Sequence, residues 1–255
     1  MHIEYRVYGR GDPAVILIHC WACDGNYWSA QIPALKAKHT TVVIDLAGHG
    51  ASGSNRTDWS ISRYGDDVAA VARQLPNPKI VLVGHSMGGP VALEAARRIG
   101  SRVIGIVAVD ALKTIGQAPV SEREIQMRLK PFRDDFIGHT HEFFGSAFFT
   151  KDSNPQFVRK IVDDLALEPP EVAVPSLEAL MKLDLAPLVT QIHVPVVAIN
   201  ADATGPTDDA RIRKSLPTFR SVTIPNTGHF LMMEAPQRFN PVLLREIETI
   251  AHHAP

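Results

Sequence analysis

The chain has 255 residues, 45% of them hydrophobic, and a formal net charge of −1. This length and apolar fraction fit one large α/β domain with a sizeable core and argue against a disordered chain. The nearly neutral charge gives no electrostatic basis for contact with nucleic acid or an anionic membrane surface, so neither is expected as a partner.

The apolar runs have the length of strands, as in Ala14–Ile18, and are too short to cross a bilayer. Residues 1–6 carry neither the basic nor the apolar region of a secretion signal. We therefore expect a cytoplasmic protein.

Predicted strands and helices alternate along the chain. A strand with alternating polarity at 3–8 is followed by continuous apolar runs, which are typical of strands covered on both faces of a parallel sheet. These runs lie at 14–18, 41–44, 80–83, 103–109, 196–199 and 221–224, and helices are predicted at 26–37, 64–75, 87–99 and 236–251. This order predicts an α/β fold with a mostly parallel central sheet flanked by helices.

The stretch of about 113–187 shows no buried-strand pattern. It carries helical patterns and clusters of phenylalanine, including Phe143-Phe144. Ligands of open α/β sheets bind at the carboxyl ends of the strands, so we predict that 113–187 is a helical cap inserted over that edge. The α/β core would then comprise 1–112 and 188–255. A separate helical domain beside the sheet is the alternative.

The pentapeptide Gly84-His85-Ser86-Met87-Gly88 follows the strand at 80–83 and precedes a predicted helix. This is a G-x-S-x-G pattern on a strand–turn–helix frame, in which a sharp turn makes the serine hydroxyl project at the end of the strand. The two glycines are needed because a Cβ at either position would collide with the neighbouring strand and helix. We predict that Ser86 is a nucleophile, with an incidental serine in a glycine-rich turn as the alternative.

A serine hydroxyl needs a base within hydrogen-bond reach and an acid that orients the base. His229 follows the last predicted strand through the loop 225–228 and thereby reaches the edge of the sheet that also presents Ser86. We therefore predict that His229 is the base. His85, inside the pentapeptide, is expected to pack.

Several aspartates are candidates for the acid. The acid that orients the base ordinarily lies a few residues after the next-to-last strand. At that place the chain has Thr204, and Asp202 lies two residues earlier. Asp110 directly follows the strand at 103–109, at the same carboxyl edge. Asp208 and Asp209 are further candidates.

The negative oxygen that develops in acyl transfer needs two backbone N–H donors. We predict that they belong to Met87, the residue after the serine, and to Trp21, in the loop that follows the strand at 14–18. Cys20, Trp21, Phe143 and Phe144 are expected to contact the substrate.

Cys20 and Cys23 are spaced C-x-x-C in the same loop. This spacing is compatible with a redox pair, whereas a metal site would need another soft ligand and only His19 lies nearby. Because the loop has a backbone donor to hold in place, we expect two reduced, half-buried thiols and no metal site.

Together these motifs resemble the α/β-hydrolase superfamily, in the group of small capped serine esterases. The resemblance covers nearly the whole chain outside the cap. It rests on His19-Cys20-Trp21, on the D-x-x-G-x-G-x-S stretch 45–52, on 84–89 and on Gly228-His229-Phe230.

The chain departs from the usual pattern of this superfamily at two points. Cys20 stands where glycine is usual, and no acid stands at Thr204. Some members, including a branch of the haloalkane dehalogenases, carry the acid after the strand that follows the nucleophile, and 109–112 resembles that arrangement. Asp110 is therefore ranked first and Asp202 second. Those dehalogenases and the related epoxide hydrolases use an aspartate nucleophile, so Ser86 argues against both chemistries.

The resemblance implies a serine hydrolase that cleaves a small carboxylic ester through an acyl-enzyme intermediate. Ser86, His229 and Asp110 would form the triad, and no metal or organic cofactor is implied. The same residues would also serve C–C, lactone or amide cleavage, or perhydrolysis. A ligand-binding receptor on a slow hydrolase scaffold is a third hypothesis. The expected partner is a small-molecule ester, and the protein is expected to be a monomer or a homodimer.

Overall fold

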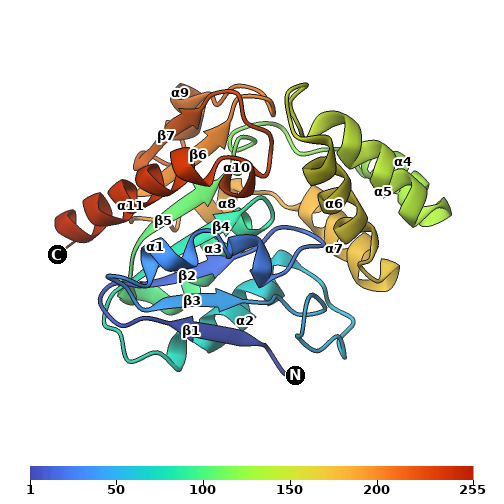
Figure 1. The fold of residues 1–255 in the computed structure, drawn as a ribbon. Helices are drawn as coiled ribbons and strands as arrows, with labels where there is room; N and C mark the ends of the chain where they lie inside the picture. Colours follow the sequence, from blue (N-terminus) through green and yellow to red (C-terminus); the bar gives the residue numbers. More distant parts are fainter. Residues whose placement is uncertain (255) are drawn as a thin grey trace.

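The computed structural model describes residues 1–254, which contain a sheet of seven strands in the order β1-β3-β2-β4-β5-β6-β7 (Figure 1). β1 (Tyr5–Tyr8) is antiparallel to β3 (Thr41–Ile44), and the other neighbours are parallel. The remaining strands are β2 (Ala14–Ile18), β4 (Ile80–His85), β5 (Val103–Val109), β6 (Val196–Ala201) and β7 (Phe219–Ile224). The predicted α/β fold with a mostly parallel sheet is confirmed.

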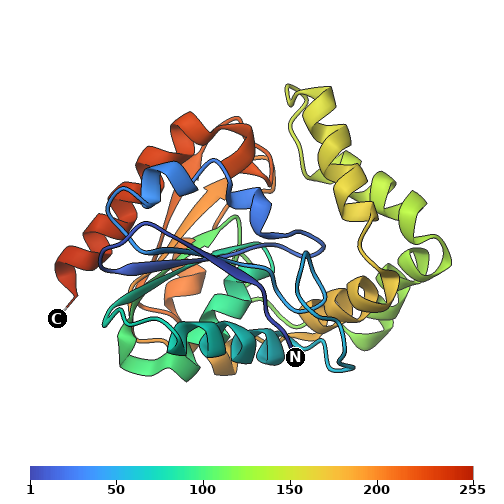
Figure 2. The ribbon, with the colours of Figure 1, turned by 60° about the horizontal axis from the view of Figure 1, so that its bottom comes forward.

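Helices cover both faces of the sheet, which explains why β2 to β6 are buried along their whole length. In Figure 2, α2 (Ile61–Arg73) and α3 (Gly88–Ile99) lie on one face, and α11 (Pro236–His253) lies on the other. The shorter helical pieces are η2 (Gly100–Arg102), α8 (Ala186–Val189), α9 (Asp209–Arg213) and α10 (Leu231–Glu234). Within residues 1–254, every helix is too short or too polar to cross a membrane.

The prediction of one continuous helix at 26–37 is wrong. The structure has a 3-10 turn, η1 (Gly25–Trp28), and then a separate short helix, α1 (Ile32–Leu35). Pro33 lies in the first turn of α1, where its missing N–H costs no helical hydrogen bond. The proline therefore starts the second piece instead of continuing the first.

Residues 113–187, called the helical segment below, contain α4 (Glu122–Asp134), α5 (Phe136–Ala147), α6 (Pro155–Ala166) and α7 (Pro170–Lys182). The side chains of Ser121, Asp135 and Asn154 cap the first three helices at their N-termini. In Figures 1 and 2 these helices lie together on the side of the sheet to which the parallel strands point. Residues that follow those strands therefore face the helical segment.

Candidate active site

Ser86 lies on a sharp turn between β4 and α3, with a backbone φ of 52°. This left-handed value is uncommon for a residue that has a Cβ. Two close approaches make the turn depend on glycine. A Cβ on Gly84 would lie 2.0 Å from the carbonyl oxygen of Gly88, and a Cβ on Gly88 would lie 2.5 Å from that of Ile18. The turn presents Ser86 at the carboxyl end of β4, as the pentapeptide predicts.

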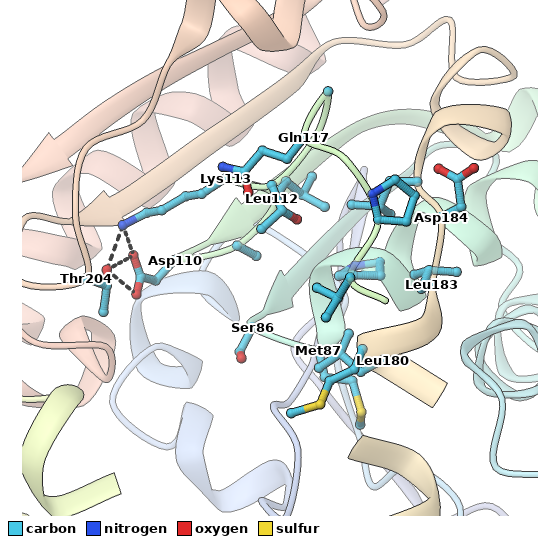
Figure 3. A pocket seen from close by; sticks show the side chains of 18 of the residues that line it. Ser86, Met87, Asp110, Leu112, Lys113, Gln117, Leu180, Leu183, Asp184 and Thr204 are labelled. Atoms are coloured by element: carbon cyan, nitrogen blue, oxygen red, sulfur yellow. Dashed lines mark hydrogen bonds and ion pairs between the residues drawn. The ribbon is translucent and has the colours of Figure 1, made fainter. Parts of the chain in front are cut away.

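A cavity of about 390 Å³ opens at this turn, and both Ser86 and His229 line it. Figure 3 shows Ser86 at this cavity. Its other walls come from the loop that follows β5 and from the end of α7 with the residues after it. Most of these wall residues are apolar, among them Met87, Leu112, Val120, Leu180, Leu183 and Leu185. The predicted nucleophile and the predicted base therefore share one largely apolar space.

The imidazole of His229 is held by Asp110. Its Nδ1–H donates to Asp110 Oδ2 at 2.6 Å, and both side chains are buried. Because Nδ1 carries this proton, Nε2 is left as the nitrogen that accepts one. Burial alone would raise the pKa of Asp110, but the hydrogen bond and charge of His229 and the ammonium of Lys113 outweigh it and hold that pKa well below its usual range.

Three groups besides His229 hold the Asp110 carboxylate. The backbone N–H of Ala201 donates to Oδ1 at 3.0 Å, and the Thr204 hydroxyl lies 2.8 Å from each carboxylate oxygen. Lys113 Nζ lies 2.9 Å from Oδ1. Thr204 occupies the place where an acid is usual, and its hydroxyl contacts the carboxylate that comes from β5.

The other aspartates considered from the sequence have different partners. Asp202 accepts hydrogen bonds from the backbone N–H groups of Asn226 and Thr227, at 2.8 and 3.2 Å. Asp208 caps α9, and Asp209 accepts from the backbone and hydroxyl of Ser221. Of the four candidates, Asp110 is the one whose carboxylate hydrogen-bonds to His229.

The loop that carries His229 is fixed by its backbone. The N–H of His229 donates to the carbonyl of Phe148 at 2.7 Å, and Glu234 Oε2 accepts from the N–H of Gly228 at 2.6 Å. His85 is fully buried, and its Nε2 donates to the carbonyl of His229 at 2.9 Å. His85 thus packs under the loop, as expected, and helps to place the neighbouring imidazole.

The loop after β2 is braced by His19. Its Nδ1–H donates to the carbonyl of Cys20 at 2.7 Å, while Nε2 accepts from the backbone N–H of Leu46 at 2.8 Å. Burial lowers the pKa of His19, in keeping with a neutral ring that has one donor and one acceptor nitrogen. Within residues 1–254, the backbone N–H groups of Trp21 and Met87 donate no hydrogen bond to another residue, and their role as oxyanion donors stays a prediction.

The expectation of two reduced, half-buried thiols is wrong. Cys20 and Cys23 form a disulfide, and both residues are buried. The loop turns back on itself here, with the N–H of Cys23 donating to the carbonyl of Cys20, and the two Cα atoms lie 5.3 Å apart. This separation is normal for a disulfide. The bridge encloses Trp21, one of the two predicted oxyanion donors.

The aromatic side chains expected at the substrate pack against one another. The Trp21 ring stacks on Phe144 with centroids 5.3 Å apart, and its Nε1–H donates to the carbonyl of Ala173 on α7. The described residues that line the cavity include Phe148 but not Cys20, Trp21, Phe143 or Phe144. Their role in substrate contact stays a prediction, and the side chain of Trp21 anchors the helical segment to the core.

The sequence did not predict Lys113, Phe148 or the wall residues 116–120, 180–181 and 183–186 as part of the site. The one signal in the sequence that could have pointed to Lys113 is its place three positions after the candidate acid. Within residues 1–254, no three His, Cys, Asp or Glu side chains gather in a way that would hold a metal ion.

A family model described as the alpha/beta hydrolase family matches residues 15–242. The chain is 26% identical over 245 residues to 3-oxoadipate enol-lactonase 2 of Acinetobacter baylyi, covering 93% of this chain and 90% of that protein. It is 29% identical over 206 residues to the pimeloyl-[acyl-carrier protein] methyl ester esterase of Methylococcus capsulatus, covering 78% and 79%.

Among solved structures, a thermophilic esterase from Thermogutta terrifontis superimposes with a TM-score of 0.82 at 24% identity, covering 97% of this chain and 93% of that one. This likeness shows a shared fold. The matched family model spans the sheet, the turn at Ser86 and the loop at His229. The chain therefore belongs to the alpha/beta hydrolase family.

Proposed function

We propose that the protein is a serine hydrolase that cleaves a small carboxylic ester with Ser86, His229 and Asp110 as its triad. The observation that carries the proposal is that His229, hydrogen-bonded to the buried Asp110 carboxylate, lines the same cavity as Ser86. Relatives of this chain named as an enol-lactonase and a methyl ester esterase support ester-bond hydrolysis.

In the first half of the reaction, Ser86 Oγ attacks the ester carbonyl carbon while His229 Nε2 takes the hydroxyl proton. The carbonyl oxygen becomes negative and accepts hydrogen bonds from the N–H groups of Trp21 and Met87. His229 then gives its proton to the departing alkoxide, and an acyl-enzyme remains.

Water completes the reaction by the same route. His229 removes a proton from water, the resulting hydroxide attacks the acyl carbon, and the proton returns to Ser86 Oγ as the carboxylic acid leaves. Asp110 remains ionised throughout, because its pKa is held well below its usual range. Its charge stabilises the imidazolium that forms twice in each turnover.

The substrate is inferred to carry an apolar group of limited size. The cavity of about 390 Å³ is walled mainly by aliphatic side chains, which favours an uncharged acyl or alcohol group. We further infer that the helical segment acts as a lid, because Leu180, Met181 and Leu183 supply part of that wall. Lactones, which are cyclic esters, are a second substrate class, favoured by the likeness to an enol-lactonase.

The test is turnover of a chromogenic short-chain ester by Ser86→Ala, with Ser101→Ala as the control. Ser101 is exposed in η2, at the opposite end of α3 from the turn at Ser86, and its replacement should leave kcat unchanged. Ser86→Ala should lower kcat by about 10⁴-fold or more and leave the melting temperature close to that of wild type. Turnover that survives in Ser86→Ala would reject the proposed function.

A further inference from the structure

We propose that Lys113 and Thr204 are positioning residues, which lock the Asp110 carboxylate against His229 and set the acid limb of the pH profile. This inference rests on the proposed function, because it assigns roles within the same triad. Figure 3 shows Lys113 extending along the cavity wall to Asp110 and Thr204, on the side away from Met87.

The ammonium group of Lys113 is fixed by several acceptors at once. Its Nζ lies 2.9 Å from Asp110 Oδ1 and 2.6 Å from Thr204 Oγ1, and it also donates to the carbonyls of Ala201 and Gly205 at 3.1 and 2.9 Å. An ammonium has three protons, so these acceptors use all of its donor capacity. The side chain is mostly buried and therefore held in one place.

The backbone of Lys113 is fixed as well. Arg211, on α9, donates to the carbonyl of Lys113 at 2.7 Å and to the carbonyl of Ile115 at 3.2 Å. The loop after β5 is thus tied to an element that follows β6. Both ends of the Lys113 side chain are anchored before any substrate enters.

Lys113 also determines how the Thr204 hydroxyl points. Lysine has no acceptor, so Nζ must be the donor in its contact with Thr204 Oγ1. The single hydroxyl proton of Thr204 is then directed to the Asp110 carboxylate, whose oxygens both lie 2.8 Å away. The result is a directed chain of hydrogen bonds from Lys113 through Thr204 to Asp110.

These contacts divide between the two carboxylate oxygens. Lys113 and the N–H of Ala201 bind Oδ1, while His229 Nδ1–H binds Oδ2. Rotation of the carboxylate would break contacts on both sides. The arrangement therefore keeps Oδ2 directed at the imidazole.

The charges around His229 come from several elements. Asp110 binds Nδ1 of the imidazole, and Lys113 in turn binds Asp110. The ring of His85, on β4, packs against the imidazole with the two ring centroids 4.7 Å apart. Asp202, after β6, and Glu234, on α10, bind the backbone of 226–228. Lys113 is the fixed cation in this set, and its charge opposes the addition of a proton to the imidazole.

The experiment compares the pH dependence of kcat/KM in wild type, Lys113→Met and Lys113→Arg, with Lys160→Met as the matched control. Lys160 is exposed on α6 and pairs with Asp164. Lys113→Met should move the acid limb upward by on the order of one pH unit and lower kcat. Lys113→Arg keeps the charge and should keep the acid limb in place, and Lys160→Met should change neither quantity.

Thr204→Val tests the second positioning residue without changing the charge. It should lower kcat by about tenfold, because the carboxylate loses one donor, and should move the acid limb less than Lys113→Met does. If Lys113→Met does not fold, Lys113→Gln provides the same comparison. An acid limb that stays at the wild-type pH in the folded, uncharged variant overturns the inference.

The outcome also separates this inference from the proposed function. If Ser86→Ala retains turnover, the proposed function itself fails. If Ser86→Ala is inactive and Lys113→Met keeps the wild-type acid limb, the triad stands and the role of Lys113 is refuted.

Discussion

His229 donates its Nδ1–H to Asp110 Oδ2 over 2.6 Å, although the two residues are 119 positions apart. They meet because both follow strands of one sheet and lie at its carboxyl edge. β5 and β6 are parallel neighbours, with Val109 opposite Ile199, so Asp110 lies beside the last two residues of β6 and the loop that carries Thr204 begins just beyond. Thr204 consequently contacts the carboxylate that binds the imidazole.

Replacing each aspartate in turn should show whether Asp110 or Asp202 is the acid that orients His229. Asp110→Asn should lower kcat by roughly 10⁴-fold, because an amide favours the imidazole tautomer that cannot accept the serine proton. Asp202→Asn should lower kcat less than tenfold, because Asp202 accepts hydrogen bonds from the backbone of 226–227, whereas His229 donates to Asp110. The measurement is kcat on a short-chain ester, and equal losses in the two variants would contradict the assignment.

The closeness of Thr204 to Asp110 suggests that the acid can be moved between strands. Thr204 Oγ1 lies 2.8 Å from both oxygens of Asp110, so a carboxylate at position 204 should come within reach of His229. In the Asp110→Asn background, adding Thr204→Asp should restore kcat at least tenfold. Thr204→Asn in the same background is the control without charge, and equal recovery in both double variants would refute the idea.

Glu168 should make stability depend on pH. Burial, aided by the charges of Asp24 and Glu171, raises the pKa of Glu168 to about 8. The folded chain therefore keeps a proton that the unfolded chain has lost above its ordinary pKa of about 4.5. The contribution of this proton to the free energy of unfolding therefore falls as the pH rises between these two values, and it is gone above about pH 8.

The measurement is the melting temperature at pH 6 and pH 9. Between pH 6 and pH 9 the melting temperature of wild type should fall more than that of Glu168→Gln, because the glutamine has no proton to lose at this position. Glu142→Gln, at an exposed position on α5, serves as the control and should follow wild type. If the melting temperatures of Glu168→Gln and wild type depend on pH in the same way, the raised pKa of Glu168 is refuted.

The disulfide should protect both cysteines from alkylation and hold the loop at Trp21. Without reductant, native protein should take up no iodoacetamide, and after treatment with a dithiol it should take up two groups. Reduction should lower the free energy of unfolding by about 2 kcal/mol, the amount expected for so short a loop. It should also lower kcat, because the Trp21 N–H loses its fixed position. Alkylation of both cysteines in untreated protein would contradict the bridge.

Much of the site follows from local sequence. Ser86 is marked by its flanking glycines, and His229 by its place after the last strand, because a strand end fixes the edge at which the next residue emerges. The strands β2, β3 and β5 have the predicted bounds, since fully buried strands read as continuous apolar runs. The ranking of Asp110 over Asp202 needed the resemblance to a family, because both follow strands that end at that edge.

The remainder depends on contacts between distant segments. Lys113 meets Thr204 and Gly205 only because β5 and β6 are neighbours, and no local pattern marks that pairing. The packing of Trp21 on Phe144 depends on how α5 folds back on the core. The C-x-x-C spacing is compatible with both reduced and bridged cysteines, and it is the geometry of the turn that brings the two together.

The most direct test of the account is labelling with a fluorophosphonate, followed by mass mapping of the modified residue. Such a reagent reacts with a serine whose hydroxyl is activated by a neighbouring base, whatever the natural substrate is. The account predicts a single phosphonylated residue, Ser86, with labelling abolished in Ser86→Ala and greatly slowed in His229→Ala. Labelling at another residue, or an unlabelled Ser86 in folded wild-type protein, would contradict it.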